Sequence, residues 1–256
     1  MHVLNVGKAD AILLECEGHF MLVDGGTVDQ GVPIRQYLTR RGVQHLDYLV
    51  NTHPDDDHMG GLEAVVQQFS VNTFLTTELP DELQPQSTSY ASLLQTIEQR
   101  HVLHKTVAAG DTVSLGSAQV DVLGPVTMAD DTNNNSLVLK VTYGETAFLL
   151  MGDAEEEEEE SLLKSGVDLS ANVLKVGHHG SNTSTTEELL EAVQPECAAI
   201  SVGQDRNHLP KKNILQRLEE AGAALYRTDL DGTLLFGSDG KIVEVQTEYE
   251  TKKEGN

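Results

Sequence analysis

The sequence contains no tryptophan, only two cysteines and few aromatic residues, with 6 Tyr and 5 Phe. Because grooves for single-stranded nucleic acid usually stack bases on aromatic side chains, this composition argues against an extended groove of that kind. No apolar run approaches the roughly 20 residues that span a bilayer. The first residues show neither the basic nor the apolar region of an export signal. We therefore expect a cytoplasmic protein without a membrane segment.

The cysteines are also informative. Cys16 and Cys197 lie far apart, and each falls in or beside an expected strand. This placement favours buried free thiols, and the sequence leaves a disulfide between them open.

Basic residues are scarce. Lys and Arg number 17 against 41 Asp and Glu, which gives a net charge of −24. Such a chain repels polyanions at long range, so net charge cannot recruit DNA or RNA. A surface adapted to high salt is one explanation of the acidity. The run Glu155 to Glu160 indicates a solvated helix start, because acidic side chains favour a helix N-terminus.

One short segment, NTHPDDDHMGG at 51–61, concentrates side chains that bind divalent metals. It places His53, Asp55, Asp57 and His58 within six residues, directly after an expected buried strand at 46–50. Imidazole nitrogens suit zinc, iron or manganese, and carboxylates shift the preference toward harder ions. A polar loop with solvated histidines is the alternative, but open α/β sheets place their ligands at such strand ends. The segment therefore predicts a metal site.

Three other segments repeat the pattern of an apolar strand followed by polar side chains. Asp153 follows the strand at 146–152, His178 and His179 follow the strand that begins at 172, and His208 comes after the strand at 197–202. Asp153 could instead cap the next helix. The alternative for the adjacent histidines is one buried and one solvated ring, but the glycines on both sides favour close approach to a ligand.

In order and spacing, these motifs resemble the H-x-H/D-x-D-H signature of the metallo-β-lactamase superfamily. The segments LNVGKADAIL at 4–13, LVDGG at 22–26, NNNS at 133–136 and HHGS at 178–181 are similar to the soluble C-terminal domain of bacterial competence DNA-uptake channels and their stand-alone relatives. The resemblance runs from about residue 2 to about residue 246. It implies an α/β fold of four layers, an αββα sandwich, which the alternating strands and helices also favour. We expect one domain over 1–247 and a polar, fraying tail over 248–256.

The resemblance also implies one or two divalent metal ions, zinc or manganese. Asp153 would bridge two ions. Asp55 stands where the wider superfamily has a histidine, and asparagines at 133–135 replace another, so oxygen donors make manganese more acceptable. The expected metal ligands are His53, Asp55, Asp57, His58, Asp153, His178 and His208.

Asp57 and His179 are the expected catalytic residues. His178 directly follows its strand, as His53 does, so we expect His178 to be the metal ligand and His179 to face the substrate as a proton donor. Asp24 is expected to orient a ligating histidine. The other side chains expected to support the ligands or contact substrate are Asn134, Asn135, Ser136, Ser181 and Lys175.

The implied activity is that of a hydrolase acting through metal-bound hydroxide, most simply a phosphodiesterase or nuclease. Hydrolysis of a lactone, thioester or other small ester stays open, as does a non-catalytic metal-binding regulatory module. Lys175, Arg206, Lys211 and Lys212 form a small positive group that could hold phosphate, unless they only serve solubility. Since no long basic stripe is present, a small phosphodiester or a short nucleic-acid end fits better than a long strand. The oligomeric state is left open.

Overall fold

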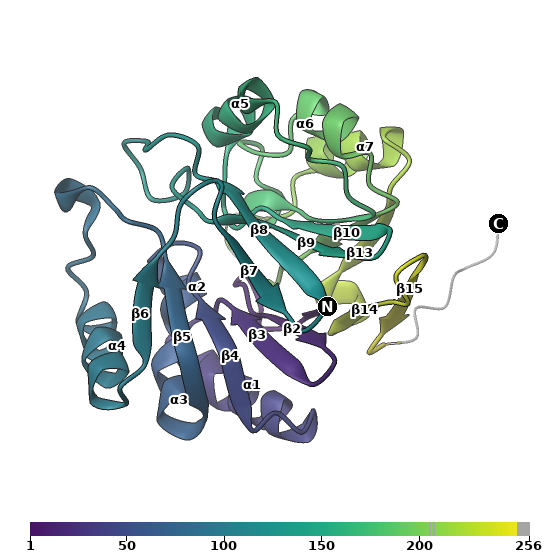
Figure 1. Ribbon diagram of the computed structural model, residues 1–256. Coiled ribbons are helices and arrows are strands. Elements are labelled where there is room, and N and C mark those ends of the chain that lie inside the picture. The colour runs from purple at the N-terminus through teal and green to yellow at the C-terminus, as the bar shows by residue number, and fades with distance from the viewer. Residues whose placement is uncertain (205, 207, 250–256) are drawn as a thin grey trace.

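The computed structural model describes residues 1–204, 206 and 208–249. Two sheets pack face to face, and helices cover the outer face of each sheet (Figure 1). This arrangement confirms the predicted αββα sandwich. Within the described residues, no helix combines the length and the apolar character needed to cross a membrane.

The first sheet has eight strands, and its helices pack on one face through a shared apolar cluster. Its strands, in spatial order, are β15 (Val243–Thr247), β14 (Leu234–Ser238), β1 (His2–Val3), β2 (Ile12–Cys16), β3 (His19–Val23), β4 (His45–Val50), β5 (Ser70–Thr76) and β6 (Leu103–Thr106). The helices on its outer face are α1 (Gly31–Arg40), α3 (Leu62–Gln68) and α4 (Thr88–Gln99). Strands β3 to β6 run parallel.

The second sheet has seven strands, of which β10 to β13 run parallel. Its strands, in spatial order, are β13 (Ala224–Arg227), β12 (Cys197–Ile200), β11 (Val173–Lys175), β10 (Thr146–Leu150), β9 (Val138–Tyr143), β8 (Ala118–Gly124) and β7 (Thr112–Leu115). Its outer helices are α5 (Glu156–Ser165), α6 (Glu187–Val193) and α7 (Lys212–Glu220). The short helical segments are η1 (Val28–Gln30), α2 (Asp56–Met59), η2 (Asp81–Leu83), η3 (Gly177–Gly180) and α8 (Thr228–Asp231).

The central strands of both sheets are buried on two faces, which explains why strands such as β10 read as continuous apolar runs. In β10, Phe148 and Leu150 point into the core between the sheets, while Leu149 packs under the helices. In β2, Leu14 faces the other sheet and Leu13 faces α1 and α3. Alternate side chains of one strand therefore join different cores, as the two-residue period of a strand requires.

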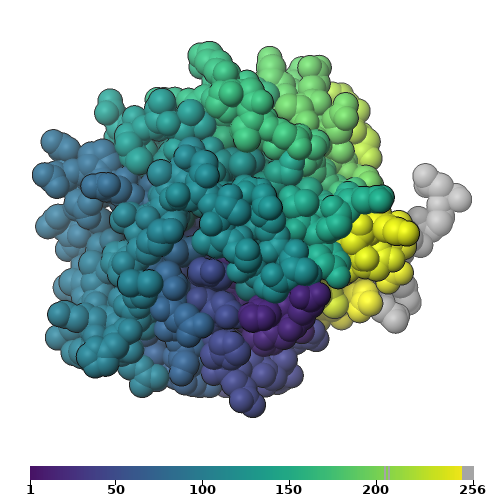
Figure 2. Space-filling view, viewed as in Figure 1, coloured from purple at the N-terminus to yellow at the C-terminus, as the bar shows by residue number. Residues whose placement is uncertain are grey.

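The ends of the chain differ in part from expectation. The apolar start of the chain forms only a short strand that ends at Val3, and Gly7 follows with a φ of 80°. β1 pairs with β14, the next-to-last strand, so the two ends of the chain lie on one side of the molecule, purple beside yellow in Figure 2. Of the predicted tail, Glu248 and Tyr249 form backbone hydrogen bonds, and 250–256 lie outside the described residues.

The acidic run from Glu155 to Glu160 is not wholly solvated, contrary to our expectation. Glu158 and Glu159 of α5 are buried. The Glu158 carboxylate accepts the Val126 N–H, and the Glu159 carboxylate accepts those of Thr185 and Thr186. These two side chains bind α5 to neighbouring loops, so they are structural.

Candidate metal centre

The site forms where loops leave the C-terminal ends of parallel strands in both sheets. Asp24 follows β3, the 51–58 turn follows β4, Asp153 follows β10 and the histidine pair follows β11. Because parallel strands end at a common edge, these loops converge there.

Glycines allow the loops to approach closely. α2 begins within the turn and places His58 inward, where the side chain is fully buried. A Cβ on Gly61 would collide with Gly25 O, and one on Gly60 would come within 2.6 Å of Val28 N. Both positions after the turn must therefore be glycine, because the segment that follows Asp24 packs directly against them.

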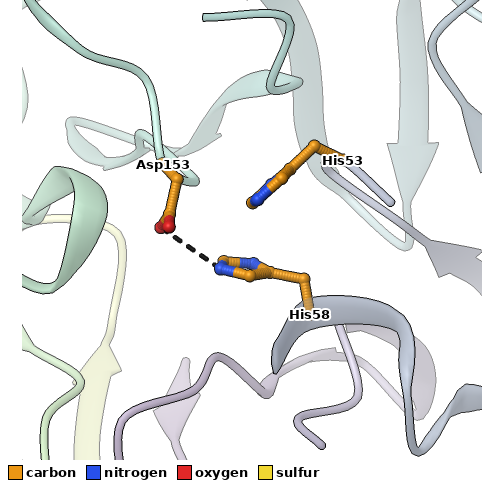
Figure 3. Close-up of side chains that lie close together, drawn as sticks. All are labelled: His53, His58 and Asp153. Atoms are coloured by element: carbon orange, nitrogen blue, oxygen red, sulfur yellow. Dashed lines mark ion pairs between the residues drawn. The ribbon is translucent and has the colours of Figure 1, made fainter. Parts of the chain in front are cut away.

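Several potential metal ligands meet in this space. One group combines His53, His58 and Asp153, which converge in Figure 3, and a second combines Asp57, His58 and His179. The ring centroids of His53 and His58 lie 4.1 Å apart, and those of His58 and His179 lie 5.5 Å apart. These residues come from three segments, after β4, β10 and β11, so tertiary folding assembles the group.

Buried ligand atoms without hydrogen-bond partners show that the residues fit a cation. They are His53 Nε2, His58 Nε2, His179 Nε2 and Asp153 Oδ1. Unpaired buried polar atoms are costly, and here they point toward one another. Imidazole nitrogens with carboxylate oxygens are a donor set for zinc, iron or manganese. The centre is therefore suited to divalent metal binding.

Asp153 lies between the two groups. Its Oδ1 is 3.2 Å from His58 Nε2, and its Oδ2 is 3.6 Å from His179 Nε2. This is the position expected of a bridging carboxylate. The alternative role as cap of α5 does not apply, because Glu155 is the N-cap residue and Asn134 Oδ1 accepts the N–H groups of Glu155 and Glu158.

The two adjacent histidines have the opposite placement to the one we predicted. His179 is fully buried, with Nε2 3.6 Å from Asp57 Oδ2, and belongs to the ligand groups. His178 is partly exposed; its Nδ1 lies 2.7 Å from Glu155 Oε1, and its Nε2 lies 3.8 Å from Asp153 Oδ2. Both residues adopt left-handed backbone angles, which turn the second ring inward. The geometry favours His179 as the ligand and His178 as the residue facing substrate.

Two polar side chains orient the ligating rings. Asp24 is buried, and its Oδ2 lies 2.8 Å from His58 Nδ1 and 2.7 Å from Thr52 Oγ1. Ser136 Oγ lies 3.2 Å from His53 Nδ1 and accepts the Asp153 N–H. Each contact leaves the Nε2 atom of the ring directed at the centre, which is the supporting role expected for Asp24.

The charges of the ligands are strongly coupled. Burial would raise the pKa of Asp153, but His179 and His58 hold it well below its ordinary value. Burial would likewise lower the pKa of His58, yet Asp153 and Asp24 raise it well above the ordinary value. Burial and the neighbouring His58 lower the pKa of His53, so this ring is neutral and ready to bind. A metal ion would have to displace the proton of His58.

The loop over 4–11 contributes two residues that we did not assign to the site. Asp10 is buried, pairs with Lys175 at 2.9 Å and leaves Oδ1 without a partner, 3.8 Å from His179 Nδ1. Lys8 Nζ donates to Asp57 Oδ2 at 2.6 Å. Burial would raise the pKa of Asp57, but His179, His58 and Lys8 lower it below the ordinary value. The GKAD sequence at 7–10 was the available signal, because charged residues there interrupt an apolar strand pattern.

Other predicted residues lie elsewhere or serve the scaffold. Lys175 is fully buried against Asp10, so it cannot receive substrate as predicted. Asn135 bonds only within its own loop, to Ala129 and Asp131. Ser181 Oγ is 3.0 Å from Thr183 Oγ1.

Asp55 and His208 lie outside the buried groups. Asp55 is half-exposed, with Oδ2 3.9 Å from His53 Nε2 and Oδ1 bonded by Thr132. His208 and Arg206 are exposed, and neither belongs to a ligand group within the described residues. The sequence cannot show this, since His208 follows β12 at the same spacing as His58 follows β4.

The chain is similar to known proteins over most of its length. The model of the metallo-beta-lactamase superfamily matches residues 4–204. ComE operon protein 3 of Bacillus subtilis (strain 168) is 30% identical over 94% of this chain and 33% of its own length. Competence protein ComA of Neisseria gonorrhoeae is 34% identical over 92% of this chain and 32% of its own. The chain thus spans about a third of the length of these relatives.

The fold also occurs among solved structures. CmlA, a diiron beta-hydroxylase from Streptomyces venezuelae, superposes with a TM-score of 0.60 at 16% identity, covering 90% of this chain and 53% of its own. At this identity the likeness shows a common fold. With the superfamily match over most of its length and a centre built from the expected motifs, the chain belongs to the metallo-beta-lactamase superfamily.

Proposed function

We propose that this protein is a metal-dependent phosphodiesterase that acts on a small phosphodiester or a short nucleic-acid end. The observation that carries the proposal is the set of buried, unpartnered ligand atoms that converge on Asp153. Zinc or manganese suits the mixed nitrogen and oxygen donors. When bound there, such an ion would lower the pKa of a water molecule that it binds and would stabilise negative charge on the substrate.

The side chains divide the remaining work. His53, His58 and His179 would hold the ions with Asp57 and Asp153, and Asp24 fixes the tautomer of His58. His178 lies at the rim with Nδ1 against Glu155, so its Nε2 can give a proton to the leaving oxygen.

The substrate class rests on two supports. The similarity to competence proteins favours a nucleic-acid phosphodiester. The acidity of the chain and its few aromatic residues favour a short or small substrate over a long strand.

Metal analysis combined with an activity assay tests the proposal. We expect the wild-type protein to bind one or two manganese or zinc ions and to hydrolyse bis(p-nitrophenyl) phosphate. Asp57→Ala should lower kcat/KM more than about 100-fold, because even residues that only support metal ligands change affinity by about 10–100-fold. Asp81→Ala, at an exposed carboxylate in η2, is the matched control and should keep full activity.

The outcomes separate enzyme from binding module. Bound ions without turnover of this ester, with either metal, would indicate a non-catalytic metal-binding module. Wild-type activity in Asp57→Ala would remove Asp57 from the centre.

A further inference from the structure

Lys8 contacts the candidate metal centre from a well-packed loop. Its Nζ lies 2.6 Å from Asp57 Oδ2, and its side chain is one-quarter exposed. The loop is fixed beside the turn, since the Asp10 N–H bonds to Asp57 O and the Gly26 N–H bonds to Asp10 O. Gly7 packs closely against Gly203, because a Cβ added to Gly203 would lie only 2.6 Å from Gly7 Cα. The ammonium group is therefore held at the mouth of the centre.

The oxygen that Lys8 contacts is also a candidate metal ligand. Asp57 Oδ2 lies 3.6 Å from His179 Nε2, and Asp57, His58 and His179 form one of the ligand groups. An ammonium and a divalent cation would thus share one carboxylate oxygen. Because like charges repel strongly at such distances, both cannot bind this oxygen in their preferred geometry.

The other lysine at the centre is enclosed. Lys175 is fully buried, pairs with Asp10 and donates to Val176 O. In the Lys8–Asp57 pair, by contrast, a partly exposed ammonium contacts a candidate ligand. If a metal bound the Asp57 oxygen, the Lys8 ammonium would be displaced toward the rim, where an anionic substrate would arrive.

We propose that Lys8 is an exchangeable counter-ion of Asp57: it competes with the metal for this carboxylate and, once the metal is bound, positions an anionic phosphoryl oxygen. The inference deepens the proposed function and rests on metal binding at this centre. A positive Lys8 side chain at the centre explains how an acidic protein with a net charge of −24 can accept an anion at one point of its surface.

Lys8→Met tests the competition with the metal. This variant keeps the length of the stem and removes the charge. We expect isothermal titration of the metal-free protein with Mn²⁺, in the absence of substrate, to show about tenfold tighter binding at the weaker site. Lys164→Met removes the same charge from an exposed pair with Glu160 and should leave Mn²⁺ affinity unchanged. Thermal unfolding would confirm that both variants fold.

The second measurement follows the anion. Inorganic phosphate should bind the Mn²⁺-loaded Lys8→Met protein about tenfold more weakly than the loaded wild type, whereas Lys8→Arg, which retains the charge, should lie close to wild type. A purely structural ion pair would give unchanged or weaker Mn²⁺ binding, and either result overturns the proposal, as does unchanged phosphate affinity. Neither measurement needs turnover, so an inactive wild type would refute the phosphodiesterase and leave this test intact.

Discussion

His178 and His179 are neighbours in sequence, yet the fold gives them different surroundings. His179 is buried among the ligand groups, and His178 lies at the rim against Glu155. We expect His179→Ala to lower the bound-metal content per chain and to be partly rescued by excess manganese. His178→Ala should keep the metal and slow turnover by about 10²–10⁴-fold, the usual effect of losing one acid–base group. Metal analysis and steady-state kinetics on both variants measure this difference.

The exposed pair of histidines around Asp47 provides the control. His19 Nδ1 lies 3.3 Å from Asp47 Oδ2, on the first sheet and away from His178 and His179. His19→Ala should change neither metal content nor rate. If His178→Ala lost the metal and His179→Ala retained it, the order that we first expected from the sequence would be restored.

Much of the centre could be predicted from residues that directly follow strands. His53, His58 and Asp153 were expected as ligands, and the structure brings them together. The order of His178 and His179 depends on left-handed backbone angles, which the sequence does not reveal. Lys8 and Asp10 belong to a loop that reads as the end of a strand. Their role follows only from the packing of that loop against the turn.

At the level of elements, α5 shows how burial changes an acidic run. Burial raises the pKa of Glu158 from 4.5 to about 7, although the Val126 N–H partly opposes this shift. Because the folded protein binds this proton more tightly than the unfolded chain, the resulting stability is complete below pH 4.5 and is lost as the pH rises toward 7. Glu158→Gln keeps an oxygen for the Val126 N–H and removes this loss. We expect its free energy of unfolding at pH 8 to exceed that of wild type by up to about 3 kcal/mol.

Urea unfolding at several pH values, with a chelator present throughout, measures this effect. The two proteins should converge near pH 4, where the wild-type carboxyl is protonated. Glu160→Gln alters an exposed member of the same run and should remain within about 0.5 kcal/mol of wild type at every pH. If the difference in free energy of unfolding between Glu158→Gln and wild type stayed constant with pH, the raised pKa of Glu158 would not be its cause.

The elements themselves were largely predictable because their apolar runs are strongly buried. β4, β10 and β12 lie within two or three residues of the expected strands, and both faces of these strands contact a core. The acidic run was harder, since charge alone predicts exposure. Glu158 and Glu159 are buried because backbone N–H groups from distant loops satisfy them, and no local pattern shows those partners.

For the whole molecule, net charge determines how substrates approach. With a net charge of −24, the protein repels an oligonucleotide at distances within the Debye length. Raising the ionic strength from about 0.01 M to about 0.1 M shortens that length from about 30 Å to about 10 Å. We expect kcat/KM for a short single-stranded oligonucleotide to rise several-fold over this range. A basic nucleic-acid-binding protein would lose affinity instead, because salt opposes the release of counterions.

Bis(p-nitrophenyl) phosphate separates this long-range effect from local chemistry. It carries a single charge, so its kcat/KM should change little over the same range, since contacts within the centre are shorter than either Debye length. A fall in kcat/KM for the oligonucleotide would show that local basic groups such as Lys8 dominate the encounter over the acidic surface. Equal responses of the two substrates would place the salt effect at the metal centre itself.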